Sequence, residues 1–163
     1  MRRADREREF TDFYLGCSVS LRRTAYVVVR DWDLAEDLLQ QAMTKLYVAW
    51  PRVRTETRMA YARRTVVNEC LSHVRRHRPE TPTDPMPDRP VDQPEATTDL
   101  AAALMVLPAR QRAIVALRFL DDLSVDEVGR LLGIADGTVK SQTNRALTTL
   151  RQHLPQLVLE ETR

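Results

Sequence analysis

The side chains best suited to binding chemistry recur on one side of a predicted helix near the C-terminal end. At about 100° per residue, hydroxyls, an amide and a guanidinium face one way: Thr138, Ser141, Gln142, Arg145 and Thr148. The opposite side is small or apolar, with Val139, Thr143, Ala146 and Leu150. Polar groups of this kind hydrogen-bond base edges and phosphates in a DNA major groove. The alternative is a helical hairpin whose polar face is only solvated.

A second predicted helix must position this face. Ser124 is suited to cap its N-terminus, and Glu127 three residues later completes a capping box. Val125, Val128, Leu131 and Leu132 then form an apolar stripe at helical spacing. Gly133 suits the left-handed C-cap, and we expect Asp136 to cap the next helix. The pattern predicts a helix-turn-helix with a recognition helix.

A second basic region lies in the first half of the chain. Residues 51–78 hold eight arginines against two glutamates, a net charge of +6. A polar loop is predicted up to Arg58, followed by a helix from about 59 to 77 that carries Tyr61, Arg63, Arg64, Asn68, Arg75 and Arg76. This combination suits a nucleic-acid backbone with unstacked bases, and a solvated arginine face is the alternative. Two separated basic regions favour a polyanionic partner held at two places.

A third candidate surface lies on the helix predicted between Asp31 and Trp50. Ala35, Leu38, Leu39, Ala42, Leu46 and Ala49 share its core face, and the opposite stripe holds Asp33, Asp37, Gln40, Gln41, Thr44 and Val48. Glutamines and an exposed valine suit protein docking as well as solvation, so the residues alone leave both interpretations open.

The composition favours an all-α protein of two small helical domains. Glycine is scarce, at four residues, and no apolar run is long enough to span a membrane or to act as a signal peptide. Two cysteines make no disulfide framework, which fits a reducing cytoplasm. Prolines and acidic residues mark a linker, so we expect a domain over 1–78, a Pro-rich acidic linker over 79–98, a helix-turn-helix domain over 99–154 and a tail over 155–163.

We expect neither a cofactor nor a metal ion. Cys70, His73 and His77 share a helical spacing, but no fourth ligand has a recognisable spacing. A nucleic-acid enzyme would need paired carboxylates or a metal site beside the basic regions, and the sequence offers neither.

The chain resembles the extracytoplasmic-function (ECF, group IV) sigma factors of bacterial RNA polymerase, most closely the actinobacterial SigE type. The resemblance covers about residues 6–154 and rests on two strings. One is DLAEDLLQQAM with the arginine-bearing helix after it, similar to sigma region 2. The other is LPARQRAIVALRFLDDLSVDEVGRLLGIADGTVKSQTNRAL, similar to sigma region 4. The resemblance implies no catalysis and promoter recognition as a polymerase subunit.

The resemblance also implies roles for individual residues. Asp37, Gln40 and Gln41 stand where the family docks on the β′ clamp helices, and the resemblance also implies the β flap of core RNA polymerase as a contact. Arg54, Thr55, Glu56 and Thr57 stand where the family captures a flipped base of the −10 element, and Arg63, Arg64, Asn68, Arg75 and Arg76 where it contacts and melts that element. Thr138, Lys140, Ser141, Gln142 and Arg145 lie on the helix that reads the −35 element. The family also allows for an anti-sigma factor as a partner.

One departure from the family string affects the expected readout. The family usually has Arg-Leu after Lys-Ser, and this chain has Gln142-Thr143. Glutamine pairs bidentately with adenine where arginine prefers guanine, so the −35 preference of other members does not carry over. Thr143 is expected to weaken the core face. The alternative function is a LuxR-like helix-turn-helix regulator, which would need a ligand pocket or a receiver-like αβ pattern before residue 78.

Overall fold

The computed structural model describes residues 1–78 and 99–154, and the predicted linker and tail lie outside the described residues. The described chain is helical without strands, which confirms the all-α expectation. Its α-helices are α1 (Arg3–Val29), α2 (Trp32–Ala49), α3 (Arg58–Arg76), α4 (Asp99–Val106), α5 (Ala109–Val115), α6 (Val125–Leu132) and α7 (Asp136–His153). None of these helices combines the length and the apolar character needed to cross a bilayer.

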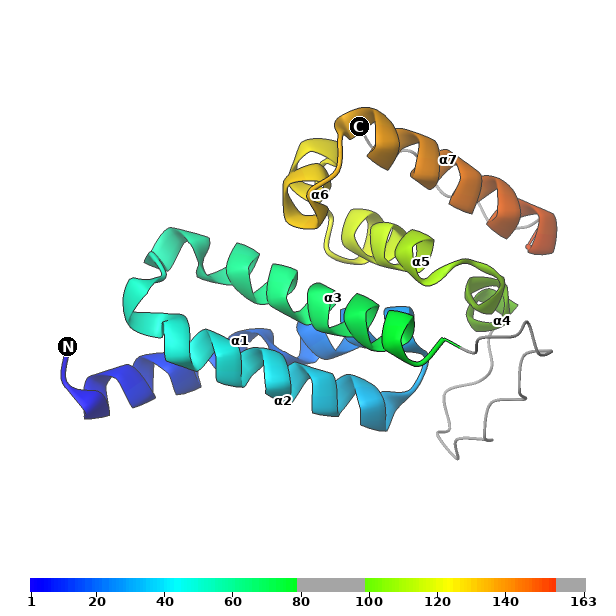
Figure 1. The fold of residues 1–163 in the computed structure, drawn as a ribbon. Helices are drawn as coiled ribbons and strands as arrows, with labels where there is room; N and C mark the ends of the chain where they lie inside the picture. Colours follow the sequence, from blue (N-terminus) through cyan, green and yellow to red (C-terminus); the bar gives the residue numbers. More distant parts are fainter. Residues whose placement is uncertain (79–98, 155–163) are drawn as a thin grey trace.

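Helices α1, α2 and α3 form the first unit (Figure 1). Asp31 caps α2, because its carboxylate accepts the backbone N–H of Leu34 at 3.0 Å. Trp50 belongs to the core of this unit. Its indole is fully buried, and the Phe10 ring packs edge-on against it with 5.1 Å between the ring centroids. Pro51 interrupts the helical ladder, so the chain passes through two short 3₁₀ turns, Trp50–Arg52 and Thr55–Thr57, before α3 begins.

Helices α4 to α7 form the second unit, which contains the predicted helix-turn-helix. The capping box is present in both directions: Glu127 N–H donates to Ser124 Oγ, and Ser124 N–H donates to the Glu127 carboxylate. Gly133 ends α6 with a φ of 67°, as expected of a left-handed C-cap. The assignment of Asp136 as a cap was wrong, because Ala135 holds the N-cap position. Asp136 is instead the first residue of α7, where a carboxylate still favours the positive helix end.

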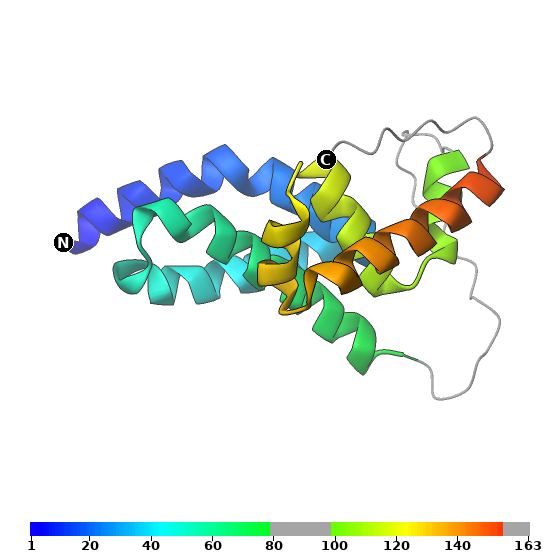
Figure 2. The same ribbon diagram turned by 90° about the horizontal axis from the view of Figure 1, so that it is seen from above.

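The second unit lies directly on the first. Figures 1 and 2 show α5 and α6 over α1 and α3, while α7 lies on the outer side of the molecule. One hydrophobic cluster runs through both units: Ile114, Leu117, Val128 and Leu131 pack with the buried residues of the first three helices. The two predicted domains are therefore joined by a shared core, which supplies burial that a unit of roughly 55 residues does not easily provide for itself.

Candidate nucleic-acid interface

Helix α7, the predicted recognition helix, buries the side that the sequence assigned to packing. Val139, Ala146 and Leu150 are buried, as predicted. Thr143 is also buried, and its hydroxyl donates to the Val139 carbonyl within the helix at 2.7 Å. The expected weakening of the core face is therefore limited, because the polar atom of Thr143 is satisfied without a partner from the core.

The opposite side of α7 is open to solvent. Thr138, Lys140, Ser141 and Arg145 are exposed, and the Ser141 hydroxyl donates to the Thr138 carbonyl at 3.1 Å. Gln142 is only half-buried, and its Oε1 accepts a hydrogen bond from Nε2 of Gln111 on α5 at 3.0 Å. Helix α7 is 18 residues long, and this polar and basic face does not pack against the protein core. A helix face of this kind has the shape and chemistry that a major groove accepts.

The loop before α3 forms a compact turn at one end of the first unit. Arg54, Thr55, Glu56 and Thr57 are all exposed. Thr57 donates both its backbone N–H and its hydroxyl to the Arg54 carbonyl, each at 2.9 Å. This turn presents threonine and charged side chains outward on a backbone that is already closed by hydrogen bonds.

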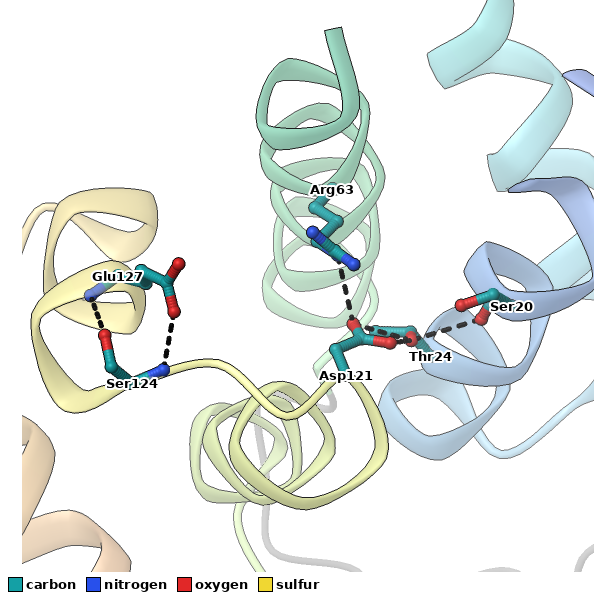
Figure 3. A network of polar contacts seen from close by, with 6 residues as sticks. All are labelled: Ser20, Thr24, Arg63, Asp121, Ser124 and Glu127. Carbon is teal, nitrogen blue, oxygen red and sulfur yellow. Dashed lines mark hydrogen bonds and ion pairs between the residues drawn. The ribbon is translucent and has the colours of Figure 1, made fainter. Parts of the chain in front are cut away.

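Helix α3 presents most of its predicted DNA-contacting residues to solvent. Arg64, Asn68, Arg75 and Arg76 are exposed. Arg63 differs, because its side chain is 22% exposed and turns toward Asp121, which follows the π-helical turn Ala116–Leu120, with 3.7 Å between Nε and Oδ2 (Figure 3). The structure therefore brings Arg64, Asn68, Arg75 and Arg76 to one solvent-facing helix and draws Arg63 into the contact between the units.

Asp121 is the centre of that contact. Its side chain is 3% exposed, and the Thr24 hydroxyl of α1 donates to both carboxylate oxygens, at 3.2 and 3.1 Å (Figure 3). Burial raises the pKa of Asp121, while Arg63 and the Thr24 hydroxyl lower it in part. The π-helical turn Ala116–Leu120 places this residue, because Asp121 N–H donates back to the Ala116 carbonyl.

A second polar contact joins the units through Arg112 of α5. Its Nε and Nη2 donate to the Val28 carbonyl near the end of α1, at 3.0 and 2.7 Å, and Nη1 donates to the Leu107 carbonyl at 2.5 Å. Arg112 thus satisfies backbone oxygens on both sides of the contact with charge-assisted hydrogen bonds.

The stripe predicted on α2 is exposed. Asp37, Gln40 and Gln41 face solvent, and Val48 on the same helix is 73% exposed. Gln40 Nε2 donates to the Tyr14 hydroxyl of α1 at 2.8 Å and to the Glu36 carboxylate at 2.9 Å, which fixes the direction of its amide. An ordered amide and an exposed apolar side chain on the same helix are both of the kinds found in protein-docking surfaces.

The described residues contain no group of three His, Cys, Asp or Glu side chains that could hold a metal ion. Cys70 is fully buried, and burial raises the pKa of its thiol to about 12. The His73 and His77 rings stack on each other with 4.0 Å between their centroids. Burial, followed by the neighbouring His77 and Arg76, lowers the pKa of His73.

Sequence reasoning missed Gln111, Arg112 and Asp121. Each acts through a partner far along the chain, and the Thr24–Asp121 bond joins residues 97 positions apart. The only local signal was that Gln111 and Arg112 are polar and come directly before the apolar run 113–117, which does not indicate their partners.

The comparisons with known proteins match both units in order. The family model described as Sigma-70 region 2 matches residues 17–80, and that of Sigma-70, region 4 matches residues 97–150. The chain is 36% identical to the RNA polymerase sigma-E factor of Streptomyces coelicolor, over 90% of this chain and 86% of that protein. It is 35% identical to the ECF RNA polymerase sigma factor SigM of Mycobacterium tuberculosis, over 82% of this chain and 71% of that protein.

A solved structure has the same fold. It is the sigma factor RpoE in complex with the anti-sigma factor NepR from Bartonella quintana, with a TM-score of 0.75 and 24% identity. The match covers 91% of this chain and 98% of the other. The arrangement of the two helical units is therefore found in another protein whose sequence has diverged widely.

Proposed function

Because the chain belongs to the extracytoplasmic-function group of RNA polymerase sigma factors, we propose that it binds core RNA polymerase and directs it to promoters with the surfaces described above. The observation that carries this proposal is the presence of both sigma regions in one chain, each with an exposed basic face. The regulator alternative is not supported, since residues 1–78 form a three-helix unit and the match to sigma region 2 begins at residue 17 and extends past its end.

The C-terminal unit would read the −35 element through α7. Thr138, Lys140, Ser141, Gln142 and Arg145 supply donors and acceptors for base edges and phosphates. Residues 137–153 carry a net charge of +3, so they can neutralise roughly three phosphates, which gives a salt dependence with a slope near −3. Each good base contact adds only about 1–3 kcal/mol, so this helix alone is a weak anchor.

The N-terminal unit would open the −10 element. The turn of Arg54, Thr55, Glu56 and Thr57 is the proposed receptor for an extruded base, and Arg64, Asn68, Arg75 and Arg76 would hold the separated strand. Extruding a base costs a few kcal/mol, which contacts in the turn must recover. Arg63 would join this set only after leaving Asp121.

Binding to polymerase supplies the free energy of promoter binding that the DNA contacts of the two units do not provide by themselves. Asp37, Gln40 and Gln41 would dock on the β′ clamp helices, and the C-terminal unit on the β flap. Once both units are held on one polymerase, the second DNA contact becomes intramolecular, with effective concentrations that reach the millimolar range. In this role the protein is a binding subunit without catalysis of its own, it works in the cytoplasm with the polymerase, and an anti-sigma factor is a further candidate partner.

Run-off transcription with purified core RNA polymerase on genomic fragments tests the proposal. Adding the protein should create specific start sites. The combined change Thr55→Ala, Glu56→Ala and Thr57→Ala should reduce strand opening, seen by permanganate reactivity, more than it reduces pull-down of polymerase. Asp37→Arg should reduce pull-down of polymerase more than the combined change in the turn does. A core enzyme that neither binds the protein nor gains start-site preference would refute the proposal.

A further inference from the structure

The side-chain amide of Gln142 is held by a residue of a different helix. Gln111, in the first turn of α5, donates Nε2–H to Gln142 Oε1 at 3.0 Å, and both side chains are half-buried where α5 packs against α7. Lys140, Ser141 and Arg145 on the same face are exposed. Gln142 is thus oriented from outside its own helix.

The orientation of a glutamine amide decides which base it fits. A free glutamine offers a donor and an acceptor side by side, which matches the N7 acceptor and the N6–H donor of adenine. Guanine presents two acceptors, N7 and O6, and therefore pairs with a head that offers donors alone, as arginine does. A hydrogen bond from within the protein takes one of the two lone pairs of Oε1 and fixes the direction of that oxygen, so it biases the amide of Gln142 toward donating to a base.

In this structure Oε1 accepts its hydrogen bond from α5, so the acceptor of the Gln142 amide is engaged within the protein and its Nε2–H groups are the donors that a base can meet. The geometry points to Gln111 as a specificity-determining positioning residue: by occupying Oε1 of Gln142 it makes that glutamine select guanine over adenine. The inference rests on the proposed function, since it requires α7 to read the −35 element. It reverses the adenine pairing that Gln142 suggests when the sequence is considered alone.

The test uses the full chain with core RNA polymerase. A pool of templates carries a randomised −35 region, each template has its own transcribed barcode, and sequencing of the RNA gives the base preference at each position. Gln142→Ala identifies the position that Gln142 reads, because the preference there disappears. At that position the unaltered chain should favour guanine over adenine by between about fivefold and about a hundredfold, the range of one bidentate contact.

Two substitutions of Gln111 then separate orientation from stability. Gln111→Ala frees Oε1, so the preference at this one position should move toward adenine. Gln111→Glu places a carboxylate, which cannot donate, beside Gln142, so it would accept a hydrogen bond from Gln142 Nε2. The Gln142 Oε1 then turns outward, and the preference should shift to bases that donate, cytosine and adenine. Arg110→Ala, a change at the exposed neighbour, should leave the base preference as it is.

The outcomes distinguish this inference from the proposed function. If Gln142→Ala flattens one position but that position prefers adenine in the unaltered chain, Gln111 does not set the readout. The same conclusion follows if both Gln111 variants change total RNA yield and leave the preference intact. If Gln142→Ala changes no position, the proposed reading role of Gln142 fails with it. Urea unfolding midpoints of all variants confirm that only folded protein is compared.

Discussion

Replacing Gly129 with alanine is expected to destabilise the helix-turn-helix, although alanine is the better helix former. Gly129 is buried in the middle of α6, against the turn that leads to α7. A Cβ at this position would lie 2.9 Å from the Ile134 carbonyl oxygen and 3.0 Å from Asp136 Oδ1. The nearer atom belongs to the backbone of the turn, so it cannot move aside as a flexible side chain can.

Two opposing terms set the size of the effect. Alanine gains about 1 kcal/mol over glycine inside a helix. Overpacking a tight site costs about 1–3 kcal/mol, and the contact with the Ile134 oxygen places Gly129→Ala toward the upper part of that range. We expect the variant to lose about 1–2 kcal/mol of unfolding free energy.

Gly137 provides the matched control. It lies in the first turn of α7, and a Cβ there meets no atom within 4 Å. Gly137→Ala should therefore gain up to about 1 kcal/mol from propensity. Urea unfolding followed by circular dichroism measures both, with the midpoints compared at constant slope. The steric argument is refuted if Gly129→Ala is as stable as Gly137→Ala.

Three further predictions concern the contact between the units, the capping box and the thiols. Arg112→Ala should lower the unfolding free energy, measured with urea, by about 2–4 kcal/mol, because the Val28 and Leu107 carbonyls lose their donor. The control Arg130→Ala removes an exposed ion pair with Asp126 and should lower it by at most about 0.5 kcal/mol. Similar losses in the two variants would contradict this prediction. Hydrogen bonds from Ser124 lower the pKa of Glu127, so this carboxylate contributes stability above its ordinary pKa, and the contribution is lost as the pH falls through the lower folded pKa. Glu127→Gln should therefore weaken the acid dependence of the unfolding midpoint, and an unchanged acid limb would oppose this reasoning. Burial raises the pKa of the Cys70 thiol to about 12, so maleimide at pH 7.5 should modify Cys70 only after denaturant is added, as read by mass spectrometry; rapid modification in native buffer would show that the thiol is accessible.

Local chemistry explains which features the sequence predicted correctly. The Ser124–Glu127 capping box and the Gly133 C-cap depend on residues within one or two helical turns, and both were found as expected. The buried side of α7 followed from helical periodicity alone. Asp136 was misassigned by a single position, because a carboxylate is favourable both as the cap and in the first turn.

Contacts across the chain could not be predicted in the same way. Nothing near Asp121 in sequence indicates that it meets Thr24 and Arg63, and nothing near Gln142 indicates Gln111. These pairs depend on how α5 lies against α1, α3 and α7, which periodicity does not determine. Sequence similarity supplied the two regions and their roles, but the exact neighbours of each side chain required the assembled fold.

The shared hydrophobic cluster determines the distance between the two proposed DNA-binding surfaces in the isolated molecule. Drawing the units apart would bring Ile114, Leu117 and Leu131 into water. Three such side chains correspond to a penalty on the order of 5 kcal/mol. Any larger assembly that needs a different spacing must offset this penalty with new contacts, so its measured affinity understates the strength of the contacts it makes.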